Sequence, residues 1–143
     1  MLKRILWVVW QAVWGLPQNL AGAVMYLLFR KSEHLRFHGA VVTAWKFRGC
    51  CSIGCFIFME ERCMHDRQLL VHEFGHTIQS ALLGWLYLPV IVLPSTIWYM
   101  VPALRKWRHD KGISYYRFYT ESWANHLGEK WCGEPSMGRA MID

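Results

Sequence analysis

Residues 69–83 read LLVHEFGHTIQSALL, and within them the pentapeptide HEFGH occupies 72–76. Residues four apart on an α-helix lie on one face, so His72 and His76 would present their imidazoles to the same point. Zinc takes two of its ligands in this arrangement. Glu73 would project beside the metal, where a carboxylate can act as a general base. The pentapeptide therefore predicts a metal-dependent hydrolase, most often a peptidase.

The sequence on both sides of the pentapeptide favours a helix of ordinary length. It contains no proline, and only Gly75 interrupts it. Asp66 is placed to cap the N-terminus, and Gly84 is placed to end the helix. The alternative is that His72 and His76 are ordinary histidines on a helix that packs into a core, with no metal between them.

A catalytic zinc centre keeps three protein ligands and leaves one position for water, so the pentapeptide alone is incomplete. The metzincin pattern would require Gly and His where the chain has Gln79 and Leu82, which excludes that class. The Asp-Gly element of the site-2 proteases is absent from the sequence. The remaining candidates are the acids and histidines that follow the pentapeptide: His109, Asp110, Glu121, His126, Glu129 and Glu134.

Residues 120–125, TESWAN, distinguish Glu121 from the other candidates. They resemble the second motif of the gluzincins, zinc peptidases whose third ligand is a Glu on a later helix, written E-x-x-[AS]-D. The resemblance implies that Glu121 completes a Zn²⁺ site and that Ala124 lets the two helices approach. Asn125 stands where the family has an Asp that accepts a hydrogen bond from the first ligating histidine, and its amide oxygen can also accept. The alternative for Glu121 is a solvated acid in the first turn of an amphipathic helix.

Among the gluzincins, the chain resembles membrane-bound peptidases related to the prenyl-protein (CaaX) protease and its bacterial heat-shock relatives. It also resembles small bacterial proteins with a membrane-associated H-E-x-G-H helix. The resemblance covers two short motifs and implies hydrolysis of a peptide or protein substrate, with Glu73 returning a proton to the leaving amine. The oxyanion donor would be Tyr116, chosen among Tyr115, Tyr116, Tyr119 and His109. The alternative function is a non-catalytic, membrane-anchored metal-binding or interaction protein.

The composition indicates that the chain meets a membrane. Its 143 residues suffice for one modest domain, yet 54% of them are hydrophobic and nine are Trp. Two apolar stretches, 5–29 and 81–104, account for this excess and contain no charged residue. Basic residues stand at their ends, and Trp and Tyr cluster there as they do at membrane interfaces. The net charge of +6 therefore fits anionic lipid headgroups, and we do not expect nucleic acid as a partner.

The order of the motifs limits how the second stretch can meet a membrane. His76 precedes residues 81–104 and Glu121 follows them, so a single crossing would leave two ligands of one metal on opposite sides. We therefore expect this proline-interrupted stretch to be re-entrant or interfacial, entering and leaving on one side. The alternative is a hydrophobic loop packed under the active helix of a soluble protein.

Residues 1–36 are expected to anchor the chain in a membrane, which would be a bacterial inner membrane. The apolar stretch within them could span once or form two short helices hinged near Pro17. Removal of this stretch as a signal peptide is the alternative, but its apolar character resumes directly after the A-x-A-like sequence at 21–23.

Residues 37–143 are expected to form a minimal zincin-like domain of the α+β class, mainly helical. The segments 41–47 and 55–59 read as strands joined by a glycine-containing turn, which predicts a β-hairpin before the active helix. By resemblance, 55–59 would be an edge strand that pairs with an extended substrate, or the hairpin would only cover the helix. Five cysteines without a C-x-x-C pair favour reduced thiols over a disulfide framework.

Overall fold

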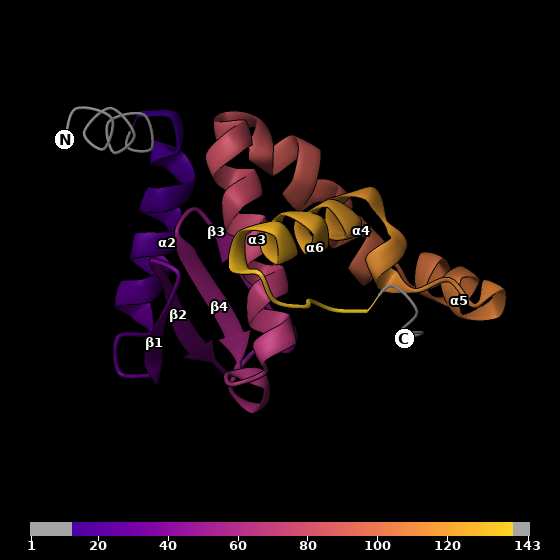
Figure 1. The fold of residues 1–143 in the computed structure, drawn as a ribbon, viewed down its shortest axis with the longest axis horizontal. Coiled ribbons are helices and arrows are strands. Elements are labelled where there is room, and N and C mark those ends of the chain that lie inside the picture. The colour runs from indigo at the N-terminus through magenta and orange to yellow at the C-terminus, as the bar shows by residue number, and fades with distance from the viewer. Residues whose placement is uncertain (1–12, 139–143) are drawn as a thin grey trace.

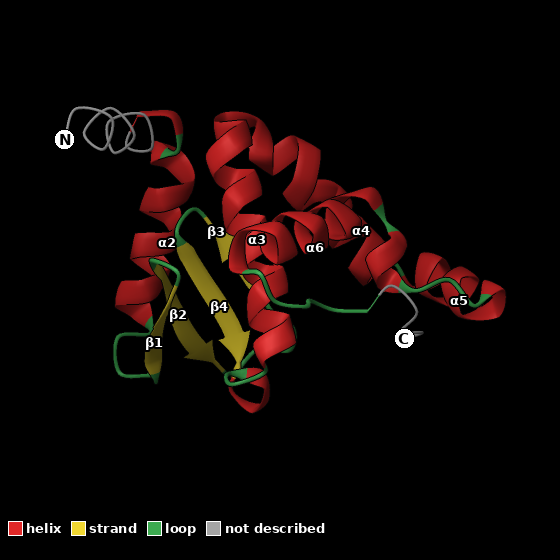
Figure 2. Ribbon diagram, in the orientation of Figure 1, coloured by secondary structure: helices red, strands yellow, loops and turns green. Residues whose placement is uncertain are grey.

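The computed structural model describes residues 13–138 as an α+β fold, mainly helical, with one four-stranded mixed sheet (Figure 1, Figure 2). The predicted fold class is confirmed at this level. The strands are β1 (His34–Phe37), β2 (Ala40–Trp45), β3 (Cys51–Ile53) and β4 (Phe56–Glu60). The longer helices are α2 (Leu16–Leu28), α3 (Arg67–Leu83), α4 (Leu93–Met100), α5 (Pro102–Lys111) and α6 (Tyr119–Cys132). The short helical turns are η1 (Glu61–Cys63), η2 (Gly84–Leu86), η3 (Leu88–Val92) and η4 (Tyr115–Arg117).

The predicted hairpin of 41–47 and 55–59 is wrong in its pairing, although both strands exist. β2 and β4 lie side by side in parallel, because the chain between them reverses direction twice. The reversals occur near Gly49 and Gly54, both of which have positive φ, and β3 lies between them. The antiparallel pairs are β1 with β2 and β3 with β4.

The sheet order is β1-β2-β4-β3, so β4 is an internal strand. The expectation that 55–59 form a substrate-binding edge is therefore wrong. The edge strands are β1 and β3, and β3 packs against α3. The backbone carbonyl of Ser52 on this strand accepts a hydrogen bond from the Tyr87 hydroxyl at 2.8 Å, so this acceptor of the edge is already paired within the chain.

α3 contains the pentapeptide and packs between the sheet and α6 (Figure 1). Asp66 caps its N-terminus by accepting from the backbone N–H of Leu69 at 3.2 Å, and the helix ends at Gly84, where φ is 54°. Both predicted boundaries are confirmed. Every residue from Leu70 to Thr77 is buried, so the polar side chains of the pentapeptide need hydrogen-bond partners inside the protein.

Glycines and an alanine let α3 and α6 approach closely. A Cβ atom on Gly75 would lie 1.9 Å from the carbonyl oxygen of Ala124, and one on Gly128 would lie 2.1 Å from the carbonyl oxygen of Val71. Ala124 is fully buried, in keeping with the small contact residue that the resemblance requires there. This backbone-to-backbone packing brings the first turn of α6 beside the histidines of α3.

Residues 84–100, which comprise η2, η3 and α4, leave the end of α3 and return towards α6 (Figure 1). We call them the bridging segment. Within residues 13–138, no single helix combines the length and the apolar character that a bilayer crossing requires. The helices Arg67–Leu86 and Leu88–Met100 meet those criteria only together, as a pair bent by 118°.

The N-terminal apolar stretch contributes a helix to the fold. Residues 1–12 lie outside the described part of the chain, whereas α2 packs on β3 and β4. Its inner face buries Gln18 and Gly22, and its outer face exposes large apolar side chains. β1 begins at His34, so the boundary predicted between 36 and 37 falls inside a strand.

Candidate metal centre

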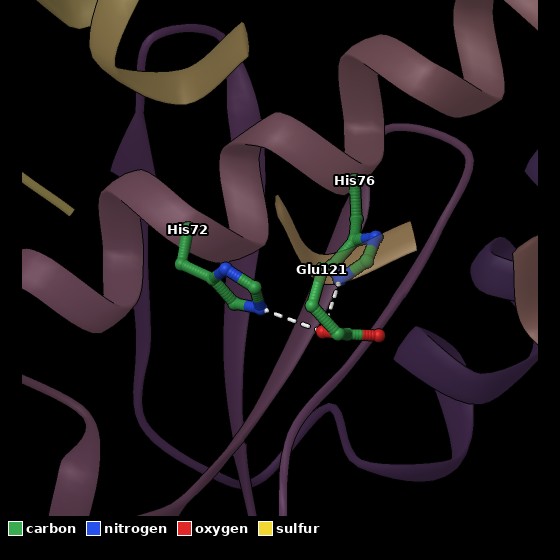
Figure 3. A group of neighbouring side chains, drawn as sticks. All are labelled: His72, His76 and Glu121. Carbon is green, nitrogen blue, oxygen red and sulfur yellow. Dashed lines mark hydrogen bonds and ion pairs between the residues drawn. The ribbon is translucent and has the colours of Figure 1, made fainter. Parts of the chain in front are cut away.

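His72 and His76 point from α3 towards Glu121 in the first turn of α6 (Figure 3). The Nε2 atoms of both histidines lie 3.2 Å from the same carboxylate oxygen, Oε2 of Glu121. The three ligand atoms lie within 4.8 Å of one another, and all three residues are buried. These residues, which we call the triad, could therefore hold a metal ion.

Attraction between opposite charges shifts the ionisation of the triad. Burial opposes the negative charge of Glu121, but His76 and His72 hold the pKa of this carboxyl well below its usual range. Burial also opposes a positive charge on His76, but the Glu121 carboxylate and hydrogen bonds raise the pKa of this imidazole to about 9. The triad thus combines a buried carboxylate with a place for positive charge, which a metal ion or a proton can supply.

Each histidine is oriented by an oxygen on its far side. His72 Nδ1 lies 2.7 Å from Oδ1 of Asn125, and His76 Nδ1 lies 2.7 Å from Oε1 of Gln79. An acceptor at Nδ1 keeps a proton there and leaves Nε2 available to a metal. Asn125 therefore lies where the resemblance to the gluzincins places it. Gln79 was not predicted for such a role, and its amide nitrogen is fixed in turn by donating to the carbonyl of Thr120 at 2.8 Å.

The two carboxylate oxygens of Glu121 have different partners. Oε2 faces both histidines, while Oε1 accepts hydrogen bonds from the hydroxyls of Ser95 at 2.5 Å and Thr120 at 3.0 Å. These hydroxyls hold the carboxylate with one oxygen turned towards the histidines. Ser95 belongs to the bridging segment, so an apolar part of the chain contributes directly to the site. No local pattern marks Ser95, because its contact depends on the return of that segment to α6.

The donor set narrows the ions that the triad could hold. Two imidazole nitrogens and a carboxylate suit zinc and other divalent transition metals, whereas Mg²⁺ and Ca²⁺ prefer oxygen ligands. No protein-family model, curated protein or solved structure matches the chain. The metal centre therefore rests on its own geometry: buried ligand atoms on two packed helices, each side chain fixed by a further hydrogen bond.

Glu73 is buried next to the triad and is held by a residue of β3. Its carboxylate Oε2 accepts a hydrogen bond from the Ser52 hydroxyl at 2.7 Å. The same hydroxyl lies 2.9 Å from the backbone carbonyl oxygen of Glu73 and can donate there instead. Ser52 lies on β3 and is itself buried, so the predicted general base is fixed from outside its own helix.

Two of the four candidate oxyanion donors lie at the site. The ring of Tyr116 packs edge-on against the imidazole of His72, with ring centroids 5.1 Å apart. Tyr115 lies close to Glu121, and burial together with the charges of Glu121 and Glu73 raises the pKa of its hydroxyl far above the usual value. Both phenols belong to η4, which immediately precedes α6.

The other two candidates are directed elsewhere. The hydroxyl of Tyr119 donates to the backbone carbonyl of Val90 at 2.5 Å, which ties α6 to the bridging segment. His109 is exposed on α5. The structure thus reduces the candidates to Tyr115 and Tyr116, and the role of Tyr116 stays a prediction.

Proposed function

We propose that the protein is a zinc-dependent metallopeptidase that works at a membrane surface. One observation supports this most strongly: the triad assembles three ligand atoms from two helices, with Glu73 next to the first ligand in sequence. Within residues 13–138, the group of possible metal ligands at this site consists of the three triad residues. Catalytic zinc centres keep three protein ligands, whereas structural centres close the tetrahedron with a fourth.

A zinc ion held by the triad would lower the pKa of its water to about 7 and polarise a substrate carbonyl. The proton of the attacking water is then transferred by a residue of the chain. Glu73 accepts it from the attacking water and returns it to the leaving amine. The Ser52 hydroxyl can stay hydrogen-bonded in both protonation states of Glu73, because it has a second acceptor in the Glu73 backbone carbonyl.

A phenol at the site would stabilise the negative oxygen that develops in the transition state. Tyr115 lies against Glu121, whereas the ring of Tyr116 lies against His72. We retain Tyr116 as the proposed donor, because its ring lies against His72, the ligand that directly precedes Glu73 in the sequence.

The bridging segment supports the membrane part of the proposal, because its polar side chains point inwards and its apolar side chains point outwards. Its polar side chains Tyr87, Ser95 and Trp98 face the protein, and each donates a hydrogen bond to another element. Its outward apolar side chains are between 37% and 63% exposed: Trp85, Leu86, Leu88, Val90, Leu93, Ile97 and Met100. A water-facing amphipathic helix has the opposite arrangement, so this outer surface fits an apolar environment.

α2 adds a second exposed apolar row beside the bridging segment. Its outward side chains are half or more exposed at a spacing of three or four residues: Leu16, Leu20, Val24 and Leu27. Trp14 and Gln18 donate to the backbone carbonyls of Leu82 and Gly84, which keeps the start of α2 beside η2. We call the two outer surfaces together the apolar face. With basic residues following each element, it suits the interface of an anionic bilayer.

The test of peptidase activity separates metal binding from hydrolysis. Glu73→Gln keeps the shape of the side chain and spares the ligands, so the variant should bind zinc as the wild type does. It should lose hydrolysis of a fluorogenic peptide mixture by roughly 10²-fold or more, because the base is gone. Glu61→Gln, at an exposed acid of η1, is the matched control and should keep both properties. Undiminished hydrolysis by Glu73→Gln would exclude its role as general base.

One observation favours a second candidate function. The ligands are almost completely enclosed, since the side chain of Glu121 is 1% exposed and that of His76 10% exposed. Enclosure of this degree suits a membrane-anchored metal-binding or interaction protein without turnover. Zinc binding without hydrolysis, in the wild type as well as in Glu73→Gln, would support this alternative. The buried acid at Glu73 favours the enzyme, because a site that only binds metal needs no base there.

A further inference from the structure

We propose that residues 134–137, which follow α6, form a strap that sets the orientation of the Asn125 amide and thereby holds His72 ready for metal. Asn125 is 1% exposed, and both ends of its amide are engaged. Its oxygen lies 2.7 Å from His72 Nδ1, and its nitrogen donates to the backbone carbonyl of Met137 at 3.0 Å. One side chain therefore connects the C-terminal segment to a ligand of the triad.

The strap is fastened at two further points before it reaches Asn125. Arg67, at the start of α3, donates a hydrogen bond to each carboxylate oxygen of Glu134, both at 2.6 Å. Ser136 is buried, and its hydroxyl donates to Glu129 on α6 at 2.7 Å. Figure 1 shows the segment turning back beside α6 after that helix ends. Contacts to both helices of the metal centre thus fix the position of the Met137 carbonyl.

The Met137 carbonyl determines which end of the Asn125 amide faces His72. A carbonyl can only accept, so it selects the NH₂ end of Asn125 and turns the amide oxygen towards His72. That oxygen accepts from Nδ1–H, which leaves Nε2 of His72 directed at Glu121 and available to a metal. A carboxylate at position 125 would place an acceptor against the Met137 carbonyl. The strap therefore accounts for Asn in place of the Asp that the gluzincin motif has.

The inference concerns the metal centre and does not depend on peptide hydrolysis. Its test is the zinc dissociation constant, measured by competition with a chromogenic chelator. The strap-release variant Glu134→Ala/Ser136→Ala removes two fastenings and leaves α3 and α6 intact. We expect its zinc dissociation constant to rise roughly tenfold, the size of effect found when partners of metal ligands are removed. Arg67→Ala releases the same strap from the other side and should act in the same direction.

The decisive comparison places Asn125→Asp in two backgrounds. In the otherwise intact chain, the carboxylate faces the Met137 carbonyl and should weaken zinc binding by roughly tenfold or more. In the strap-release background the carbonyl can move away, and the charged oxygen is a stronger acceptor for His72. There the same substitution should cost little or improve binding. A merely structural role of the strap would not change the effect of Asn125→Asp between the two backgrounds.

The ion pair of Arg62 with Glu60 provides the matched control, because it joins η1 to β4 and includes no residue of the triad or of the strap. Glu60→Ala/Arg62→Ala should bind zinc as the wild type does. Wild-type zinc affinity in both strap variants, or an equal effect of Asn125→Asp in both backgrounds, would overturn the inference. A wild-type chain that binds no zinc would overturn the strap and the metal centre together, whereas zinc binding without hydrolysis would leave the strap standing.

Discussion

His76 couples metal binding to pH. Burial opposes its charge, but in the metal-free chain Glu121 raises the pKa of this imidazole to about 9, so it is protonated at pH 7. A metal must displace that proton. Zinc binding at pH 7 should therefore release about one proton per chain, and the apparent affinity should rise with pH until about 9. Calorimetric titration in buffers of different ionisation enthalpy measures the released proton.

The control for this measurement is His126, a histidine exposed on the same helix as Glu121. His126→Ala should leave the number of released protons unchanged. A binding enthalpy that does not depend on the buffer would contradict proton sharing within the triad.

Among single residues, His72 and His76 could be predicted from helical geometry, whereas Glu121 and Asn125 were selected by the resemblance of residues 120–125 to the second gluzincin motif. The i and i+4 positions of one helix place two ligands together, and the same spacing relates Glu121 to Asn125. The supporting contacts of Ser52 and Ser95 could not be predicted. Each depends on how a distant element returns to the site, and serines have no spacing that would mark such a role.

At the scale of secondary-structure elements, the site depends most on the close packing of α3 against α6. A methyl group on Gly75 would lie 1.9 Å from the backbone carbonyl oxygen of Ala124. Because the clash is with backbone atoms, a change of side-chain rotamer cannot relieve it. Gly75→Ala should therefore push the helices apart and lower the free energy of unfolding by about 1–3 kcal/mol, the usual cost of overpacking. Zinc affinity should fall as well, because Glu121 would move away from the histidines. Chemical denaturation and a zinc titration measure the two effects.

Gly112, in the turn after α5, is the matched position for comparison. A Cβ there would meet nothing within 4 Å, although its φ of 60° is unfavourable for alanine. Gly112→Ala should therefore cost about 1 kcal/mol and leave zinc affinity unchanged. Equal zinc affinity in Gly75→Ala and the wild type would show that the helix contact does not position the ligands.

The elements also show where prediction from sequence stops. The boundaries of α3 followed from its cap at Asp66 and its end at Gly84, which are local signals. The strands β2 and β4 were found from their composition, but their pairing was not. A strand pattern does not specify its partner, and the short β3 between two glycine turns reads as a loop. Because β3 was not predicted, one reversal of the chain was missed, and β2 and β4 were predicted as a hairpin although they pair in parallel.

At the scale of the whole molecule, the apolar face predicts binding to lipid vesicles. Leu86→Glu/Leu93→Glu replaces two outward leucines of the bridging segment, each 54% or more exposed. Burying a leucine contributes about 1.5–3 kcal/mol, so this double variant should bind vesicles of phosphatidylcholine and phosphatidylglycerol at least tenfold more weakly than the wild type. Co-flotation on a density gradient measures the bound fraction.

Trp131, 65% exposed near the end of α6, provides the control for vesicle binding. Trp131→Glu removes a large apolar side chain outside the apolar face and should bind vesicles as the wild type does. Equal binding by the wild type and Leu86→Glu/Leu93→Glu would remove the bridging segment from the lipid contact. The return of that segment to α6 could be inferred from the order of the ligands, but its inward polar side chains could not.

The account depends above all on His72, His76 and Glu121 binding one cation together. The most direct test is a zinc titration of the wild type against Glu121→Gln, which keeps the shape of the side chain and removes the negative charge. The wild type should bind about one zinc per chain, and Glu121→Gln should bind it roughly 100-fold more weakly or not at all. One equivalent of zinc bound with equal affinity by both proteins would contradict the metal centre.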